Sequence, residues 1–318
     1  MTVISGMRFN QSEGAIVADE ESSNALRKSE IATKLATYAS EDHSAKIVLG
    51  GTGASDILYD INLQLQQTFQ QQNNVNDGRD LVGFVAHVMG MVKKQYLDGY
   101  LFNKFRLREI DFQTGHIATP EGNHPIDPSI MQQYHQLISG QGEFAQLINN
   151  AFLAVTTDKT GIQLYNVSMA LANPVPVARP YESAGIGSDT ADNELYAFFE
   201  NIPREKRPNV DRIDGLTALL YATYRAGVRN HGVGGTPHIA IIKGNELILP
   251  EENSSKLGVE VVRAARSGFV GEAFKREALD GLMYKNAAFD AIDKAMWSEA
   301  KKLEKDNSLG LMLRGYKV

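Results

Sequence analysis

Thr2, directly behind the initiator methionine, is the first residue of the chain that could carry out chemistry on its own. A threonine at a free N-terminus offers a hydroxyl that attacks a carbonyl group and an α-amine that accepts the hydroxyl proton, so no separate histidine is needed. Because methionine aminopeptidases accept a small second residue, we expect Met1 to be removed and the mature chain to begin at Thr2 without a propeptide. Met-Thr starts are common, so this prediction depends on the residues that follow.

The segments behind Thr2 have the pattern of strands joined by short polar turns. Residues 2–9 and 14–19 are predicted strands joined by the turn 10–14, which together make a hairpin, and residues 31–39 and 46–50 form the next predicted pair. Asp19 ends the second strand in AIVAD, and Lys34 lies in the third, EIATKLATY. Lys28 competes with Lys34, but it lies among polar residues, where a solvated charge is the default interpretation.

A glycine turn follows in KIVLGGTGASD, where a predicted strand leads into a helix. Glycine accepts backbone dihedrals that side chains forbid, so the chain there can approach a bound group closely. N–H groups at such a turn point toward a bound carbonyl, and one N–H of Gly51, Thr52 or Gly53 is therefore a candidate oxyanion donor. The alternative is a phosphate-binding loop or a plain turn, but a nucleotide loop would have lysine where Ala54 stands.

This order of segments resembles the proteasome β-subunit and HslV family of threonine hydrolases. Their chains begin with a threonine strand, followed by a strand ending in VAAD, a strand carrying lysine and a glycine-rich turn into a helix. The resemblance implies that Thr2 is the nucleophile, that Asp19 is the buried aspartate, and that Lys34 lowers the pKa of the nucleophilic pair. Asp19 follows Thr2 by 17 positions (19 − 2) and Lys34 follows Asp19 by 15 (34 − 19), each about one residue from the family register. A longer first turn and a shorter next loop would absorb the difference.

The resemblance continues in the second half of the chain and departs from the family at two positions. Gly187-Ser188 resembles the family's glycine-serine turn before a long helix, although Ser188 could equally cap that helix, and Asp189 stands where the family has glycine. Asn230 stands where the family has aspartate, and Val233 stands where it has serine. An amide in place of a carboxylate keeps part of the hydrogen bonding, so Asn230 remains a candidate catalytic residue.

Two further residues complete the set of candidates. Ser23, shortly after Asp19, is a candidate substrate-binding residue, and His231 is a neighbour that could compensate for the changes at the catalytic positions. A lone histidine in a turn is more often a bystander.

Two long amphipathic helices are predicted after the glycine turn, the first with an apolar face from Ile57 to Phe69 and the second with an apolar face from Leu81 to Tyr100. Another helix is predicted at 210–228, before a closing hairpin made of HIAII, the turn 243–245 and LIL. Hairpin pairs flanked by helices predict an α+β fold, a four-layer αββα sandwich of two antiparallel sheets between helices, as in the N-terminal nucleophile hydrolases that the chain resembles. We expect a core domain at 1–250 with an insertion at about 106–150 that holds a helix near 129–150. A helical C-terminal extension is expected at 251–318.

Composition limits the function classes. The net charge is −6, no basic stripe is interleaved with aromatics, and cysteine is absent, so nucleic-acid binding, disulfides and thiol chemistry are not expected. No early apolar run is long enough for a signal peptide or a membrane span, which predicts a cytoplasmic protein with no membrane contact. His116, His124, His135, Glu121 and Asp127 fall in one stretch, but without HxxxH or HxH spacing we expect neither a metal nor another cofactor.

Two function classes remain open. The first is a threonine-dependent amide hydrolase, a peptidase that cleaves a peptide or protein substrate through an acyl-enzyme on Thr2, inside a homo-oligomeric ring or spiral. The second is an assembly or binding protein on the same fold with altered catalysis. A non-proteolytic amidase or a transpeptidase lies between them, because an amine or water can resolve the acyl-enzyme. Fold resemblance does not choose among these, and neither the substrate nor an unfoldase partner can be predicted from the sequence.

Overall fold

The computed structural model describes residues 2–19, 22–24, 27–29, 34–40, 43–69, 77–138, 149–230 and 233–314, with the backbone alone at 22–24, 27–29 and 314. Within these residues the chain forms two five-stranded antiparallel sheets. The first sheet has the order β12 (Tyr181–Ala184), β1 (Ile4–Arg8), β2 (Glu13–Ala18), β13 (His238–Lys243) and β14 (Glu246–Ile248). The second has the order β11 (Asn173–Pro176), β10 (Gly161–Ser168), β9 (Ala151–Asp158), β6 (Lys46–Thr52) and β5 (Leu35–Ala39). Two short hairpins, β3 (Ser22–Asn24) with β4 (Arg27–Ser29) and β7 (His116–Thr119) with β8 (Gly122–Pro125), lie outside both sheets.

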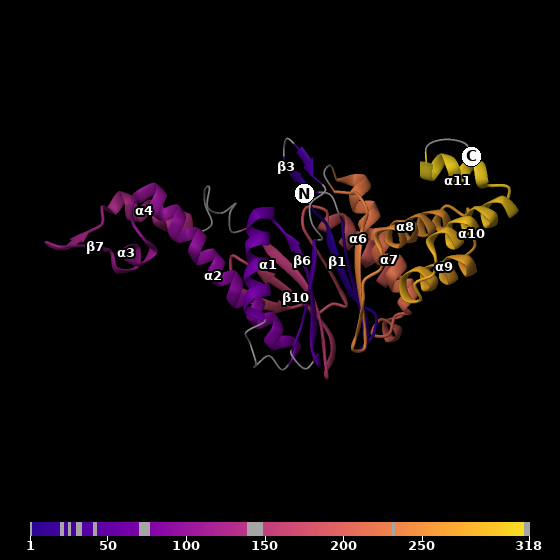
Figure 1. Ribbon diagram of the computed structural model, residues 1–318, viewed down its shortest axis with the longest axis horizontal. Coiled ribbons are helices and arrows are strands. Elements are labelled where there is room, and N and C mark those ends of the chain that lie inside the picture. The colour runs from indigo at the N-terminus through magenta and orange to yellow at the C-terminus, as the bar shows by residue number, and fades with distance from the viewer. Residues whose placement is uncertain are drawn as a thin grey trace.

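The described helices flank the sheets or lie at the two ends of the molecule (Figure 1). They are α1 (Ser55–Phe69), α2 (Gly78–Phe105), α3 (Glu109–Thr114), α4 (Pro128–Ile138), α6 (Ser188–Glu200), α7 (Arg212–Arg229), α8 (Glu252–Arg266), α9 (Glu272–Tyr284), α10 (Phe289–Lys302) and α11 (Asp306–Arg314), with the 3₁₀ turn Arg204–Lys206 before α7.

The central strands β1, β2, β6, β9 and β13 are buried along most of their length, and most of their buried residues are apolar. In β13, Ala240 and Ile242 face the second sheet, whereas Ile239 and Ile241 face the helices behind the first sheet. The layer between the sheets is filled by apolar side chains of both sheets, among them Ile4, Ile16, Val48, Leu153 and Val155. Side chains of α1 and α2 cover the outer face of the second sheet. The predicted four-layer αββα sandwich is therefore confirmed.

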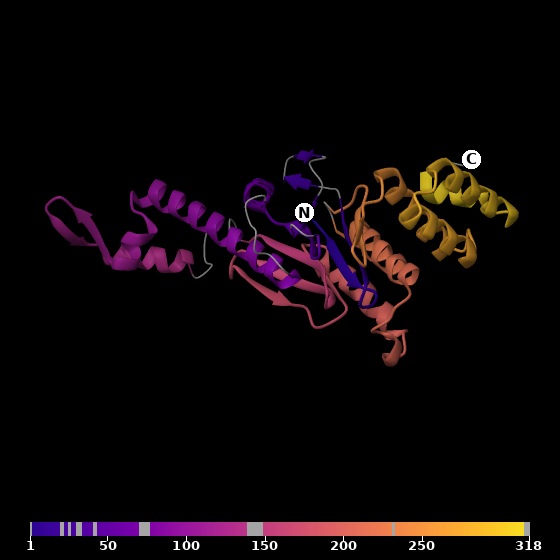
Figure 2. The same ribbon diagram turned by 60° about the horizontal axis from the view of Figure 1, so that its bottom comes forward.

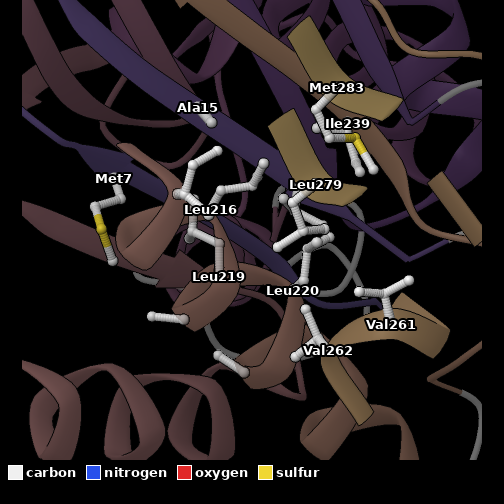
Figure 3. Close-up of a cluster of buried hydrophobic side chains, with 14 of the residues drawn as sticks. Met7, Ala15, Leu216, Leu219, Leu220, Ile239, Val261, Val262, Leu279 and Met283 are labelled. Atoms are coloured by element: carbon white, nitrogen blue, oxygen red, sulfur yellow. The ribbon is translucent and has the colours of Figure 1, made fainter. Parts of the chain in front are cut away.

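Helix α7 is the centre of the largest buried cluster. Figure 3 shows Leu216, Leu219 and Leu220 of this helix between the sheet residues Met7 and Ala15 and the residues Val261, Val262, Leu279 and Met283. The last four belong to α8 and α9, so these C-terminal helices pack on the helical layer of the sandwich. The predicted helical character of 251–318 is thus observed at 252–314, while a domain boundary near 250 stays a prediction.

The stretch beyond residue 105 lies at the far end of α2, away from the sheets (Figures 1 and 2). Helices α3 and α4 and the hairpin β7–β8 gather there around a separate small apolar cluster that includes Leu101, Phe112 and Tyr134. Of the helix expected near 129–150, the part up to Ile138 is observed as α4, residues 139–148 lie outside the described part of the chain, and residues 149 and 150 are not helical.

In the described residues we find no helix with the length and apolarity that a membrane crossing requires. The same residues hold no group of three or more histidine, aspartate or glutamate side chains placed to hold a metal ion.

Candidate functional site

Thr2 lies at the entrance to β1, where the register of the first hairpin places it beside Asp19. The pairing of Ile4 with Ala18 sets Val3 opposite Asp19. The Asp19 N–H donates to the Val3 carbonyl (3.0 Å), and the Val3 N–H donates to Asp19 Oδ1 (2.8 Å). The carboxylate is therefore fixed to the backbone of the residue directly after the predicted nucleophile.

Asp19 and Lys34 form a buried ion pair. Lys34 Nζ donates to Asp19 Oδ1 at 2.8 Å, and the two side chains are 9% and 2% exposed. The Gly234 N–H donates to Asp19 Oδ2 at 3.1 Å. Burial raises the pKa of the Asp19 carboxyl, and the charge and hydrogen bond of Lys34, with the N–H groups of Val3 and Gly234, act in the opposite direction. One carboxylate thus holds a cation and two backbone segments together.

The hydrogen bonds of the glycine turn at the end of β6 show which of its N–H groups could still bind an oxyanion. The Gly51 N–H is already bonded to the Lys34 carbonyl (3.1 Å), and Thr52 pairs with Ala151 in the ladder with β9. Among the described residues, no acceptor receives the Gly53 N–H. Gly53 has a φ of 132°, which L side chains rarely adopt, so glycine is required at this place. Of the three predicted positions, Gly53 retains a backbone donor for a ligand.

Asn150 holds this turn in place. Its Oδ1 accepts the Ala54 N–H at 2.7 Å, and a side chain at position 53 would collide with Asn150. Asn150 is buried and immediately precedes β9. The Asn150 side chain therefore fixes the glycine turn by a hydrogen bond to its backbone, as the Asp19 carboxylate fixes the backbone directly before β1.

The turn before α6 packs on Thr2 itself. The Gly187 N–H donates to the Thr2 carbonyl at 3.3 Å, and the Ser188 N–H donates to the Gly185 carbonyl at 3.0 Å. Ser188 is the first residue of α6 and Gly187 is its N-cap, so the alternative that Ser188 caps this helix is wrong. No hydrogen bond among the described residues joins the Ser188 hydroxyl to Thr2.

Asn230 lies at the C-terminal end of α7, and its side chain forms hydrogen bonds there. Its Nδ2 donates to Thr190 Oγ1 (3.2 Å) and to the Ala226 carbonyl (2.9 Å). Val233, at the second position that departs from the family, is buried in the helical cluster. The structure therefore brings Thr2, Asp19, Lys34 and the turn before Ser188 together, but not the Asn230 side chain.

The other candidates fall where side chains are not described. Ser23 pairs with Lys28 across the β3–β4 hairpin, where the structure describes the backbone and not the side chains. Met1 and His231 lie outside the described residues.

A cavity of about 530 Å³ opens beside this cluster. Asp19 and Gly234 belong to its wall, together with residues of α7, α8 and α11, whereas Thr2 does not. The cavity is thus next to the carboxylate side of the cluster.

No model of a protein family matches the sequence, and no curated protein is similar to it in sequence. Solved structures are similar in fold. Anbu (ancestral β-subunit) from Yersinia bercovieri matches with a TM-score of 0.56 and 13% identity, over 84% of this chain and 94% of that chain. An Anbu mutant from Hyphomicrobium sp. strain MC1 matches with a TM-score of 0.53 and 10% identity, over 96% of each chain.

A third structure, the helical assembly of the Anbu complex from Pseudomonas aeruginosa, matches with a TM-score of 0.53 and 13% identity, over 76% of this chain and 81% of that chain. At these identities the likeness concerns the fold. The chain therefore has the fold of Anbu, the ancestral β-subunit, and with it the proteasome β-subunit and HslV type of fold that the order of its sequence segments predicts.

Proposed function

We propose that the chain is an N-terminal threonine hydrolase that cleaves amide bonds. The observation that supports this most directly is the Asp19 carboxylate, whose Oδ1 accepts both the Lys34 ammonium and the N–H of the residue after Thr2. This arrangement puts a buried cation next to the start of the chain, where an attacking hydroxyl would need it. A purely structural ion pair would not have to be at this end of β1.

In the proposed reaction, the Thr2 hydroxyl attacks the carbonyl carbon while its proton passes to the α-amine freed by removal of Met1. The Gly53 N–H receives the oxyanion, and the Lys34 charge stabilises the alkoxide. When the tetrahedral intermediate collapses, the C–N bond breaks and the leaving amine takes the proton from the α-amine. Water, or a second amine, then attacks the acyl-Thr2 ester and regenerates the hydroxyl.

Labelling with an electrophile tests this proposal. Protein made without an N-terminal tag is expected to have a mass lacking one methionine, and an epoxyketone is expected to add once, because it reacts with both the hydroxyl and the α-amine of a terminal threonine. Intact-mass spectrometry measures both changes. The Thr2→Ala chain should also lose Met1 but should gain no adduct. Complete retention of Met1 in the native host, with no adduct, would contradict the proposal.

One observation favours an assembly or binding protein as the second candidate. The Asn230 side chain is occupied by Thr190 and Ala226, and Val233 is buried, so neither is bonded to Thr2 where the resembled family has aspartate and serine. Under this alternative the fold persists without turnover. An unreactive Thr2 in a chain that still assembles is the result that would support it.

We also propose that the chain forms a homo-oligomer, a ring or an open spiral. The Pseudomonas aeruginosa relative in fold forms a helical assembly, and α1 of this chain exposes apolar side chains such as Tyr59 and Leu63 on its outer face. Analytical ultracentrifugation at micromolar concentration should show species larger than one chain. A sharp, monodisperse monomer would contradict this expectation.

A further inference from the structure

The cavity beside Asp19 is a built site with its own chemistry. Its volume of about 530 Å³ falls within the range of roughly 300–1,000 Å³ that small-molecule sites occupy. The wall is formed by the loop 234–237, by residues of α7 and α8, and by Leu313 of α11. Together with Asp19, five separate parts of the chain therefore converge on it.

One face of α8 carries the charged part of this wall. Lys256, Val259, Glu260 and Arg263 line the cavity, and their spacing of three, four and seven residues from Lys256 puts them on the same helical face. Two cations against one acid give this face a net positive charge. The two cations favour an anionic group there.

The two cations differ in how they are held. Arg263 stacks on the Tyr224 ring, with 4.6 Å from its Cζ to the ring centroid, and donates to the Met312 carbonyl at 3.1 Å. Its position is therefore fixed before a ligand arrives. Lys256 is exposed and lines the cavity, so its ammonium can turn toward a bound anion. A fixed guanidinium and an adjustable ammonium together suit a carboxylate.

The remaining wall is largely apolar and includes one unsatisfied hydroxyl. Val228, Val259, Pro237 and Leu313 offer an aliphatic surface. Thr223 is 5% exposed, and its Oγ1 has no hydrogen-bond partner among the described residues.

We propose that this cavity binds the C-terminal end of a peptide, or an N-acylamino acid, whose last side chain is aliphatic. The carboxylate lies at Lys256 and Arg263, and the side chain packs on Val228, Val259 and Leu313. This inference rests on the proposed amide hydrolase, because such ends are what amide cleavage produces. Since Asp19 and Gly234 belong both to the cavity wall and to the ion-pair cluster, the ligand contacts the groups that hold Thr2 without occupying the place of attack.

The test is a ligand-observed NMR titration of the full chain with N-acetyl-leucine and with N-acetyl-leucinamide, which lacks only the carboxylate charge. N-acetyl-leucine is expected to bind saturably, and about tenfold more tightly than the amide, a ratio that corresponds to about 1.4 kcal/mol. Lys256→Met should remove most of this preference, and Val259→Trp, which fills the cavity, should abolish binding of both probes. Lys243→Met, at an exposed hairpin turn, is the matched control and should bind both probes as the unchanged chain does.

Absence of saturable binding, equal affinity for the two probes, or an unchanged preference in Lys256→Met would each overturn the proposal. If Val259→Trp does not fold, Lys256→Met still tests the proposal, because the Lys256 side chain is exposed and its replacement should not prevent folding. Carrying out the titration on Thr2→Ala separates the two hypotheses, since cavity binding is expected to persist there while epoxyketone labelling is lost. Binding without labelling in the unchanged chain would therefore contradict the hydrolase alone.

Discussion

Lys34→Ala is expected to slow epoxyketone labelling of Thr2 by about 10²–10³-fold, the usual effect of removing one group that stabilises the developing charge. The Lys34 ammonium is 2.8 Å from Asp19 Oδ1, and the same oxygen accepts the N–H of Val3. Its charge is therefore fixed close to the start of β1, inside the protein, where screening by water is weak. The rate is measured as adduct formation over time by intact-mass spectrometry.

The same substitution also destabilises the fold, and the two effects can be separated. Removing one partner of a buried ion pair costs roughly 3–5 kcal/mol when the other charge stays unpaired. Asp19→Asn in the Lys34→Ala background removes that charge and is expected to recover much of the stability in urea unfolding without recovering labelling. Lys28→Ala is the control, with an unchanged labelling rate expected. If Lys28→Ala stopped labelling and Lys34→Ala did not, the assignment of the lysine would be wrong.

The parts of the fold that the sequence predicts are those fixed by contacts between neighbours in the chain. The first hairpin follows from the apolar runs around the turn 10–14, and its register then sets Val3 opposite Asp19. Because β2 ends at Ala18, the charge of Asp19 falls where the first sheet meets the loops. Helix α7 and the hairpin of β13 and β14 follow from their periodicity in the same way.

The contacts that complete the site link residues far apart in the chain, and local pattern does not predict them. Asn150 holds Ala54 across 96 positions, and Gly234 donates to Asp19 across 215. Each depends on how the two sheets and α7 pack, which spacing within a segment does not determine. The direction of the Asn230 side chain is likewise not predictable from local pattern. It bonds to Ala226 in the last turn of α7 and to Thr190 of α6, and the second bond depends on how these two helices pack.

Gly185→Ala is expected to lower the free energy of unfolding by roughly 2–5 kcal/mol, as the sum of a strained backbone and an inserted methyl group. Gly185 follows β12 and has a φ of 94°, which an alanine rarely adopts. A Cβ at this position would overlap the Thr2 carbonyl oxygen and would lie 3.2 Å from Thr52 Oγ1. The absent side chain thus lets three segments meet: the start of the chain, the end of β6 and the turn before α6.

Gly185→Ala is also expected to slow epoxyketone labelling of Thr2 strongly, even where the variant stays folded. Moving Thr2 by about 1 Å would cost on the order of 10²-fold in reactivity, because nucleophile and oxyanion donor must be aligned. Gly244→Ala is the matched control: its φ is 56°, and a Cβ there would meet nothing within 4 Å. It should lose about 1 kcal/mol from the left-handed backbone and label at the normal rate. If the two variants lost equal stability and labelled equally fast, the Gly185 turn would not be what positions Thr2.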